Sequence, residues 1–240
     1  LEFVPGMIVT QHSGDGKANQ YFLRGFNLDH GTDFATFVDV MPVNMRSHAH
    51  GQGYSDLNFL IPELVQRIDY KKGTYFADEG DFASAGAAHL RLAEKLGAGS
   101  ASLSLGGYGY QRAVLANSVA LTNGNLLYGL EINRNDGPWI NPENVRKYSA
   151  VLRYSQGSHD DGYSVTAMAY KNNWNSTDQV PLRAVQSGQI SRFGALDPTD
   201  GGQSSRYSLS YAIKKRNQDG VFEMDAYAVQ SSLDLFSNFT

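Results

Sequence analysis

From about Gly97 onward, apolar and polar residues alternate in runs long enough to form β-strands. The clearest runs are 128–133, 148–155 and 207–214, in which every second residue is Tyr, Leu, Ile or Ala. Less regular runs of strand length cover residues 100–110, 112–121, 163–174 and 221–235. Because a period of two places one row of side chains on each face of a strand, this half predicts about seven strands with an apolar and a polar face.

The connections between these runs alternate in length. Turns rich in Gly, Asn and Asp at 122–125, 159–162 and 217–220 are typical of tight hairpins. Longer loops occupy 135–145 and 176–203. In an antiparallel meander, tight turns would then lie at one end and long loops at the other. Outer-membrane barrels have this arrangement, and Tyr at the strand ends favours it. A soluble β-sandwich or propeller is the alternative.

The first half, to about Leu96, has a different pattern. Short apolar runs at 21–23, 37–40 and 68–70 are separated by loops rich in Gly and Asp. Only 60–67 looks briefly helical, with Pro62 suited to a first helical turn. We therefore expect two domains, a small mixed α+β domain over 1–96 and a β-domain over 97–240.

Composition supports β-structure and excludes several functions. Only 18% of the 240 residues are charged, while Gly (25), Tyr (14) and Phe (12) are abundant. The absence of Cys excludes disulfides and thiol catalysis within the chain. The net charge of −4 is spread along the sequence, so no basic patch indicates a nucleic-acid partner.

The sequence carries no signal for a helical membrane segment or a secretion signal. No stretch has the roughly 18 consecutive apolar residues of a membrane helix. The segment 1–5 lacks a signal peptide, and there is no initiator Met. We expect the numbering to start inside a longer protein and to stop within a strand near Asn238.

Four short motifs occur in a fixed order in the first half, and together they are more informative than any one of them alone. They read V-P-G-M at 4–7, Y-F-L-R-G-F at 21–26, F-V-D-V-M-P-V at 37–43 and P-E-L-V-Q-R-I-D-Y-K-K-G at 62–73. This series resembles the plug domain of TonB-dependent outer-membrane receptors. Val40 stands where that family usually has Gly, Thr74 stands where Pro is common, and 80–90 departs further from the family pattern.

The resemblance implies an α+β plug domain followed by antiparallel transmembrane β-barrel strands, here the first about seven of a 22-stranded barrel. It implies active uptake of a scarce nutrient across the bacterial outer membrane, with a ferric siderophore or other metal chelate as the commonest cargo. The implied partners are TonB, through a segment upstream of Leu1, an extracellular small-molecule cargo, and the lipid bilayer with its lipopolysaccharide. No cofactor is implied. Cobalamin, haem, copper chelates and oligosaccharides remain open as cargo.

Two further classes of protein are compatible with the residues alone. One is a surface binding or adhesion barrel without transport, and the other is a soluble β-rich hydrolase. No catalytic motif of the G-x-S-x-G or H-E-x-x-H type favours an enzyme. The pair Asp160-Asp161 sits in a turn, and the Gly-rich segment 106–109 lies in a strand pattern with no helix after it. Neither is expected to be a catalytic or nucleotide site.

The motif order predicts two outward tips of the plug, at 27–33 and 44–55. The residues that we predict to contact the cargo are Asp29, His30, Arg46, His48, His50, Gln52 and Tyr54. In an extended chain His48 and His50 point to the same side, where two neutral imidazoles could bind a metal or a chelate, or simply be solvated. Arg46 could pair with an anionic chelate or with the barrel wall.

Other side chains allow both a ligand role and a structural role. Tyr54 and Trp139 could stack on a planar ligand or pack in a core or a lipid interface. Arg24 is expected to be structural. Glu131, Arg153 and Lys214 fall on the polar phase of their strands, and we predict that they face the plug.

Overall fold

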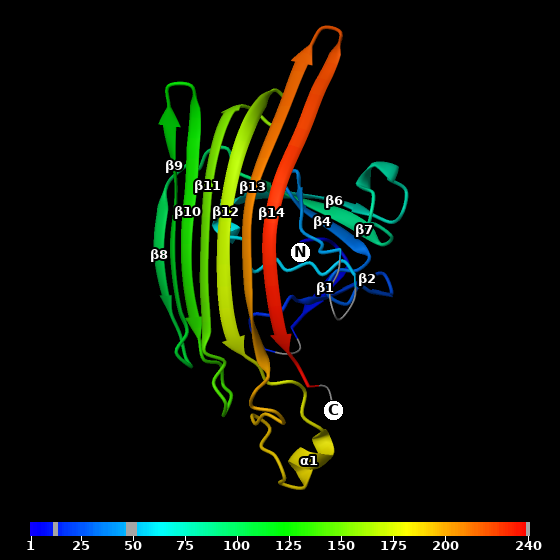
Figure 1. The fold of residues 1–240 in the computed structure, drawn as a ribbon, viewed down its shortest axis with the longest axis vertical. Coiled ribbons are helices and arrows are strands. Elements are labelled where there is room, and N and C mark those ends of the chain that lie inside the picture. The colour runs from blue at the N-terminus through cyan, green and yellow to red at the C-terminus, as the bar shows by residue number, and fades with distance from the viewer. Residues whose placement is uncertain (12–13, 47–51, 239–240) are drawn as a thin grey trace.

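A computed structural model describes residues 1–11, 14–46 and 52–238. A tall sheet forms one wall, and the smaller N-terminal part lies against one of its faces (Figure 1). Among the described residues no helix is long and apolar enough to cross a membrane.

The N-terminal part contains two small sheets. The first has the order β1-β2-β3 and the second the order β5-β4-β7-β6. Their strands are β1 (Met7–Thr10), β2 (Gln20–Leu23), β3 (Phe26–Asn27), β4 (Phe34–Val38), β5 (Met41–Pro42), β6 (Val65–Lys72) and β7 (Gly86–Leu92). The 3-10 helices are η1 (Pro62–Leu64) and η2 (Ala77–Glu79). Since β7 pairs in parallel with β4 and antiparallel with β6, the sheet joins segments far apart in sequence.

The wall is a seven-stranded antiparallel meander in which every strand pairs with its neighbours in sequence. Its strands are β8 (Ser100–Leu105), β9 (Gln111–Leu121), β10 (Gly124–Asn135), β11 (Val145–Gly157), β12 (Gly162–Asn175), β13 (Gly201–Asn217) and β14 (Gly220–Phe236). The predicted meander is therefore present. The expected domain boundary near Leu96 lies between β7 and β8.

The two ends of the wall differ as the connection lengths predicted. The tight turns β9–β10, β11–β12 and β13–β14 lie at one end, which we call the hairpin end (Figure 1). The connections β8–β9, β10–β11 and β12–β13 lie at the other, the loop end. The last and longest of these contains the short helix α1 (Leu182–Gln186).

The two faces of the wall also follow the predicted alternation. On β10 the apolar row is turned away from the plug, with Leu130 52% and Ile132 55% exposed. The alternate residues Leu127 and Glu131 are buried against the plug. The plug-facing row is not uniformly polar, because Val114, Leu127 and Val151 form one apolar cluster with Leu64 and Leu90 of the plug. Removing these apolar side chains from water stabilises the contact between plug and wall.

One local expectation was met in part, and one was wrong. The brief helix expected within 60–67 is present as the 3-10 turn η1, which begins at Pro62 and ends where the chain enters β6 at Val65. Pairing of β6 with β7 satisfies the backbone groups that a helix would have used. The Gly-rich segment 106–109 lies in the turn between β8 and β9 rather than within a strand, and Tyr108 and Gly109 take positive φ there.

Candidate functional site

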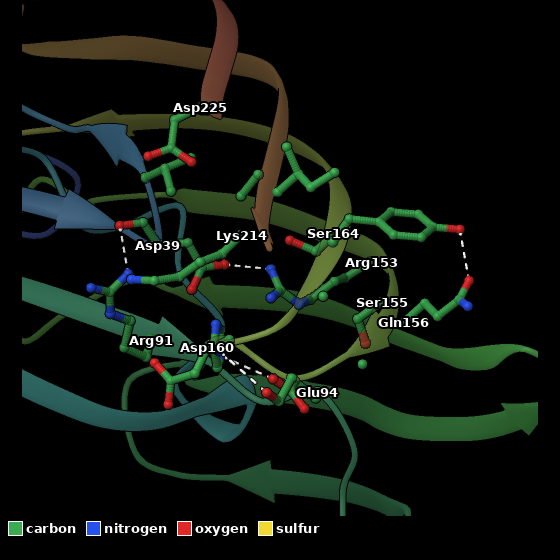
Figure 2. Close-up of a pocket in the computed structure, with 18 of the residues that line it drawn as sticks. Asp39, Arg91, Glu94, Arg153, Ser155, Gln156, Asp160, Ser164, Lys214 and Asp225 are labelled. Atoms are coloured by element: carbon green, nitrogen blue, oxygen red, sulfur yellow. Dashed lines mark hydrogen bonds and ion pairs between the residues drawn. The ribbon is translucent and has the colours of Figure 1, made fainter. Parts of the chain in front are cut away.

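A polar cleft lies between the plug and the wall at the hairpin end (Figure 2). We call it the hairpin-end cleft; its volume is about 110 Å³. Its charged lining residues are Asp39, Arg67, Arg91, Glu94, Arg153, His159, Asp160, Lys214, Glu223 and Asp225. Both signs of charge are present in similar numbers, so the cleft favours ion pairing between its walls over capture of one charged ligand.

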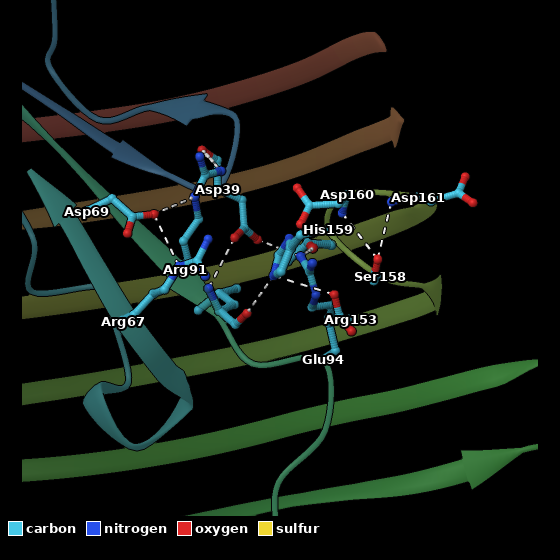
Figure 3. Close-up of polar contacts among 12 residues, drawn as sticks. Asp39, Arg67, Asp69, Arg91, Glu94, Arg153, Ser158, His159, Asp160 and Asp161 are labelled. Carbon is cyan, nitrogen blue, oxygen red and sulfur yellow. Dashed lines mark hydrogen bonds and ion pairs between the residues drawn. The ribbon is translucent and has the colours of Figure 1, made fainter. Parts of the chain in front are cut away.

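The central contact of this cleft joins the plug to the wall. Asp39 lies in the turn between β4 and β5, where the V-D-V motif was recognised, and takes a φ of 50°. Its carboxylate accepts hydrogen bonds from Nη1 of Arg153 on β11 and from the backbone N–H of Leu92 at 3.1 Å. Both side chains are buried. Figure 3 shows Asp39 and Arg153 as part of one row of polar contacts.

Further contacts in the row extend to both sides. Asp69 on β6 pairs with Arg67 at 3.2 Å and with Arg91 on β7 at 3.5 Å (Figure 3). His159, in the β11–β12 turn, places its Nε2 3.3 Å from the carbonyl oxygen of Leu92 and 3.8 Å from Glu94. The hairpin turn of the wall therefore contacts the segment that leaves the plug.

A second charged link lies nearer the loop end. Arg112 on β9 donates to both carboxylate oxygens of Glu63 in η1, at 2.6 and 2.9 Å, and to Glu131 on β10 at 2.7 Å. Glu131 also pairs with Lys147 at 3.1 Å. The Arg112 guanidinium holds the pKa of Glu63 below its usual value.

The three wall residues expected to face the plug differ in their partners. Arg153 binds the plug directly through Asp39. Glu131 reaches it through Arg112. Lys214 lines the hairpin-end cleft but pairs with Glu223 of the neighbouring strand, at 3.1 Å.

A larger and more apolar cavity of about 550 Å³ opens at the loop end. We call it the loop-end pocket. The plug contributes Gln11 and Gly14, the β10–β11 loop contributes Trp139, and the β12–β13 loop contributes Thr177, Asp178, Gln179, Val180, Leu182, Val185, Arg192 and Gly194. Its size and its mixture of apolar walls with a few polar groups are typical of sites for small molecules. The indole of Trp139 and the charges of Asp178 and Arg192 could contact a planar, polar ligand.

Two of the predicted contact residues lie inside the plug. His30 is buried, and its Nδ1 donates to the carbonyl oxygen of Ala18 at 2.8 Å. Burial lowers the pKa of His30 to about 4, so its ring is neutral at pH 7. Tyr54 is also buried; its hydroxyl accepts the N–H of Ala18 at 2.8 Å, and its ring lies 5.6 Å from that of His30.

The other predicted residues lie nearer the surface or outside the described residues. Asp29 is partly exposed, with a φ of 47° and an oxygen 3.6 Å from His30 Nε2. Arg46 and Gln52 are exposed, and both belong to the loop that the bridge between Met45 and Tyr54 closes. His48 and His50 lie outside the described residues. Within the described part of the chain, no group of three or more His, Cys, Asp or Glu residues could hold a metal ion.

Most residues of the loop-end pocket have no recognisable signal in the sequence. Trp139 was predicted as a candidate ligand contact, whereas Gln11, Asp178 and Arg192, which the fold brings to the same cavity, were not. These residues lie in loops without a periodic pattern. The only signal for them is the position of their loops at the same end of the meander.

The N-terminal part matches a known family. Residues 1–87 match the family model described as "TonB-dependent Receptor Plug Domain". The matched segment contains all four motifs on which the resemblance rested.

The whole chain is also similar to solved structures. The copper transporter OprC matches with a TM-score of 0.69 and 19% identity, over 94% of this chain and 32% of that one. The unliganded ferric citrate transporter FecA matches with a TM-score of 0.70 and 13% identity, over 98% of this chain and 37% of that one. The pyoverdine receptor FpvA from Pseudomonas aeruginosa PAO1, bound to pyoverdine, matches with a TM-score of 0.67 and 15% identity, over 96% of this chain and 34% of that one. The chain therefore spans about a third of the length of these structures and shares their fold, a plug domain against antiparallel barrel strands.

Proposed function

We propose that this chain, whose residues 1–87 match the plug domain of TonB-dependent receptors, serves the active uptake of a nutrient across the bacterial outer membrane. The observation that carries the proposal is the plug seated against one face of a meander whose other face is apolar and exposed. The matched family and structures are receptors and transporters rather than enzymes.

For the cargo we propose a metal chelate, a ferric siderophore in the first place. Three of the similar structures are a copper transporter, a pyoverdine receptor and a ferric citrate transporter. The loop-end pocket, at about 550 Å³, falls within the size range of binding sites for small molecules. Trp139 offers a flat ring, and Asp178 and Arg192 offer charges of opposite sign to a polar chelate.

The residues proposed to contact the cargo come from the plug and from the wall loops. From the plug we propose Asp29, Arg46, His48, His50 and Gln52. The buried residues His30 and Tyr54 would support the plug tip from within. TonB, the extracellular cargo, and the lipid bilayer with its lipopolysaccharide are the partners that this function requires.

An uptake experiment tests the proposal. Cells lacking the full-length receptor would be complemented with it and supplied with radiolabelled ferric citrate, ferric pyoverdine or a copper chelate. Uptake of one of these should require both the receptor and the proton-motive force. Binding at the cell surface without energy-dependent uptake would favour the adhesion barrel. A full-length protein that stays soluble without detergent would contradict both membrane functions.

The histidine pair has its own test. Replacing His48 and His50 by Ala should weaken binding of the transported chelate by roughly ten- to hundredfold, as expected for loss of a strong hydrogen bond or metal contact. If neutral imidazole is the binding form, affinity should also fall as the pH drops through about 6.5. The control is His89→Ala, because His89 is engaged with Glu79 of the plug at 2.8 Å. Unchanged affinity of the double variant would exclude the contact.

A further inference from the structure

A buried carboxylate stands behind the loop-end pocket. Glu143 lies in the β10–β11 loop with 3% of its surface exposed. Its Oε1 accepts two hydrogen bonds, one from Nε1 of Trp139 at 2.9 Å and one from the backbone N–H of Asp15 at 3.2 Å. Trp139 lines the pocket, whereas Asp15 belongs to the plug. A single oxygen atom therefore joins Trp139 of the wall loop to the backbone of Asp15 in the plug.

The surrounding backbone is built closely around this carboxylate. Gly14 has a φ of 75°, and a Cβ there would lie 2.4 Å from Glu143 Oε1. Gly137 has a φ of 65°, and a Cβ there would lie 2.6 Å from Trp139 and 2.8 Å from Glu143 Oε2. Only glycine meets both requirements, the positive φ and the missing Cβ. The plug and the wall loop thus each leave room for the same carboxylate.

The plug segment that receives this bond is held from two more directions. Nδ2 of Asn135, at the end of β10, donates to the Asp15 carboxylate at 2.6 Å. The ring of Trp174, at the end of β12, lies so close to Gly16 that a Cβ there would be 2.2 Å away. Segment 14–17 is therefore held by residues at the loop ends of β10 and β12, and Glu143 is the contact that also binds Trp139 of the pocket.

We propose that Glu143 is a positioning residue that couples the orientation of the Trp139 ring in the loop-end pocket to the position of plug segment 14–17. Because Oε1 receives both donors, moving the indole displaces the acceptor of the Asp15 N–H. A cargo that binds Trp139 and moves its ring thereby weakens the hydrogen bond from the Asp15 N–H to Glu143. Conversely, a displacement of the plug at Asp15 changes the orientation of the Trp139 ring. The inference deepens the proposed function, since it gives a route by which a ligand that moves Trp139 of the wall loop changes the position of the plug.

The coupling can be measured on the full-length receptor in detergent without any cargo. Fluorine NMR of the fluorotryptophan-labelled receptor reports the Trp139 ring, with its resonance assigned by Trp139→Phe. Hydrogen–deuterium exchange reports segment 14–17. Glu143→Ala should shift the Trp139 resonance and also speed exchange of the segment by about five- to tenfold, the size expected for one net hydrogen bond. Glu143→Gln retains a carbonyl acceptor and should leave both signals near those of the wild type.

Two controls make the test specific. Asp197→Ala removes a carboxylate at the same end whose partners, Thr199 and Asn238, belong to the wall, and should change neither signal. Introduced alone, Trp139→Phe should speed hydrogen–deuterium exchange of segment 14–17. Introduced together with Glu143→Ala, it should cause no further increase in the exchange rate. A Glu143→Ala receptor in which only one of the two signals changes overturns the proposal, as does a Gln variant that behaves like the Ala variant. Because no cargo enters the test, its failure is distinct from a failure of the uptake experiment.

Discussion

At the residue scale, Asp39 combines a backbone role and a charge role. Its φ of 50° suits Asp better than most residues in the tight β4–β5 turn. From that turn its carboxylate reaches both Leu92 of the plug and Arg153 of the wall. Arg153 also donates to Thr166 at 2.9 Å, so the buried guanidinium depends on few partners. Removing the Asp39 charge would leave Arg153 buried without its counter-ion.

We therefore expect Asp39→Asn to weaken the plug strongly. Asn tolerates the same backbone and can still accept the Leu92 N–H, so the change isolates the charge. Breaking a buried ion pair costs about 3–5 kcal/mol. The measurement is the urea dependence of plug proteolysis in the full-length receptor. Asp69→Asn is the matched control, because its pair with Arg67 is exposed and such pairs contribute about 1 kcal/mol or less. Equal losses in the two variants would show that the buried pair has no special role.

A second prediction at this scale concerns pH. Burial raises the pKa of Asp56, a plug residue beside Tyr54 and Arg206, to about 6. A carboxyl whose pKa is higher in the folded state than its unfolded value of 3.8 stabilises the fold at low pH and loses that contribution as the pH rises through about 6. The wild-type receptor should therefore lose plug stability between pH 5 and about 7.5 relative to Asp56→Asn.

The same proteolysis assay, run at both pH values, measures the difference in plug stability between the wild type and Asp56→Asn. Using the difference between wild type and Asp56→Asn cancels the titration of other groups, including His30. A difference that does not change with pH would mean that Asp56 has an ordinary pKa.

At the element scale, β7 holds the larger plug sheet together. It pairs with β4 on one side and β6 on the other. Its first residue, Gly86, has a φ of 144°, and a Cβ there would lie 2.2 Å from the backbone oxygen of Lys71 on β6. The obstacle is backbone, so it cannot move aside without breaking the pairing.

We expect Gly86→Ala to destabilise the plug by about 1–3 kcal/mol, the usual cost of inserting an atom into a packed site. Gly97→Ala is the control, because a Cβ at Gly97 would meet nothing within 4 Å. Protease resistance of the plug in urea should fall for the first variant alone. A Gly86→Ala receptor as resistant as the control would contradict the close approach of β6 and β7.

At the scale of the whole molecule, the wall separates two environments. One face packs on the plug, and the other exposes an apolar row on each of the central strands, including Leu130, Leu152 and Leu209, each at least half exposed. In water such a surface would be unstable, whereas in a bilayer it would be solvated by lipid. The proposed membrane location thus explains a surface that a soluble protein would avoid.

Leu130→Arg tests this face. Leu130 lies at the middle of β10, and Arg on the lipid face at the bilayer midplane costs about 2–4 kcal/mol. Leu121→Arg, at the end of β9 beside the hairpin turn, should cost about 0–1 kcal/mol. The measurement is reversible folding of the full-length receptor into lipid vesicles against denaturant. Similar costs at both positions would show that depth in a membrane does not set the energy.

The sequence alone determined the features that depend on neighbouring residues. Period-two alternation placed the strands and their faces, and the Gly- and Asn-rich turns placed the hairpin end, because both arise from local backbone geometry. The order of the plug motifs identified the N-terminal domain and its Asp39 turn. At 60–67 the brief helix expected from the sequence is limited to the 3-10 turn η1, because strand pairing with β7 decides the structure from Val65 onward.

Only the tertiary structure decided which distant side chains meet. Asp39 and Arg153 lie 114 residues apart, and Asp15 and Glu143 lie 128 apart. Their contact depends on the register of the wall and on how the plug seats against it, and neither leaves a periodic trace in the sequence. The same holds for the loop-end pocket, whose walls come from one plug segment and two wall loops. Alternation specifies which face of a strand a residue occupies, whereas packing between the two domains selects its partner.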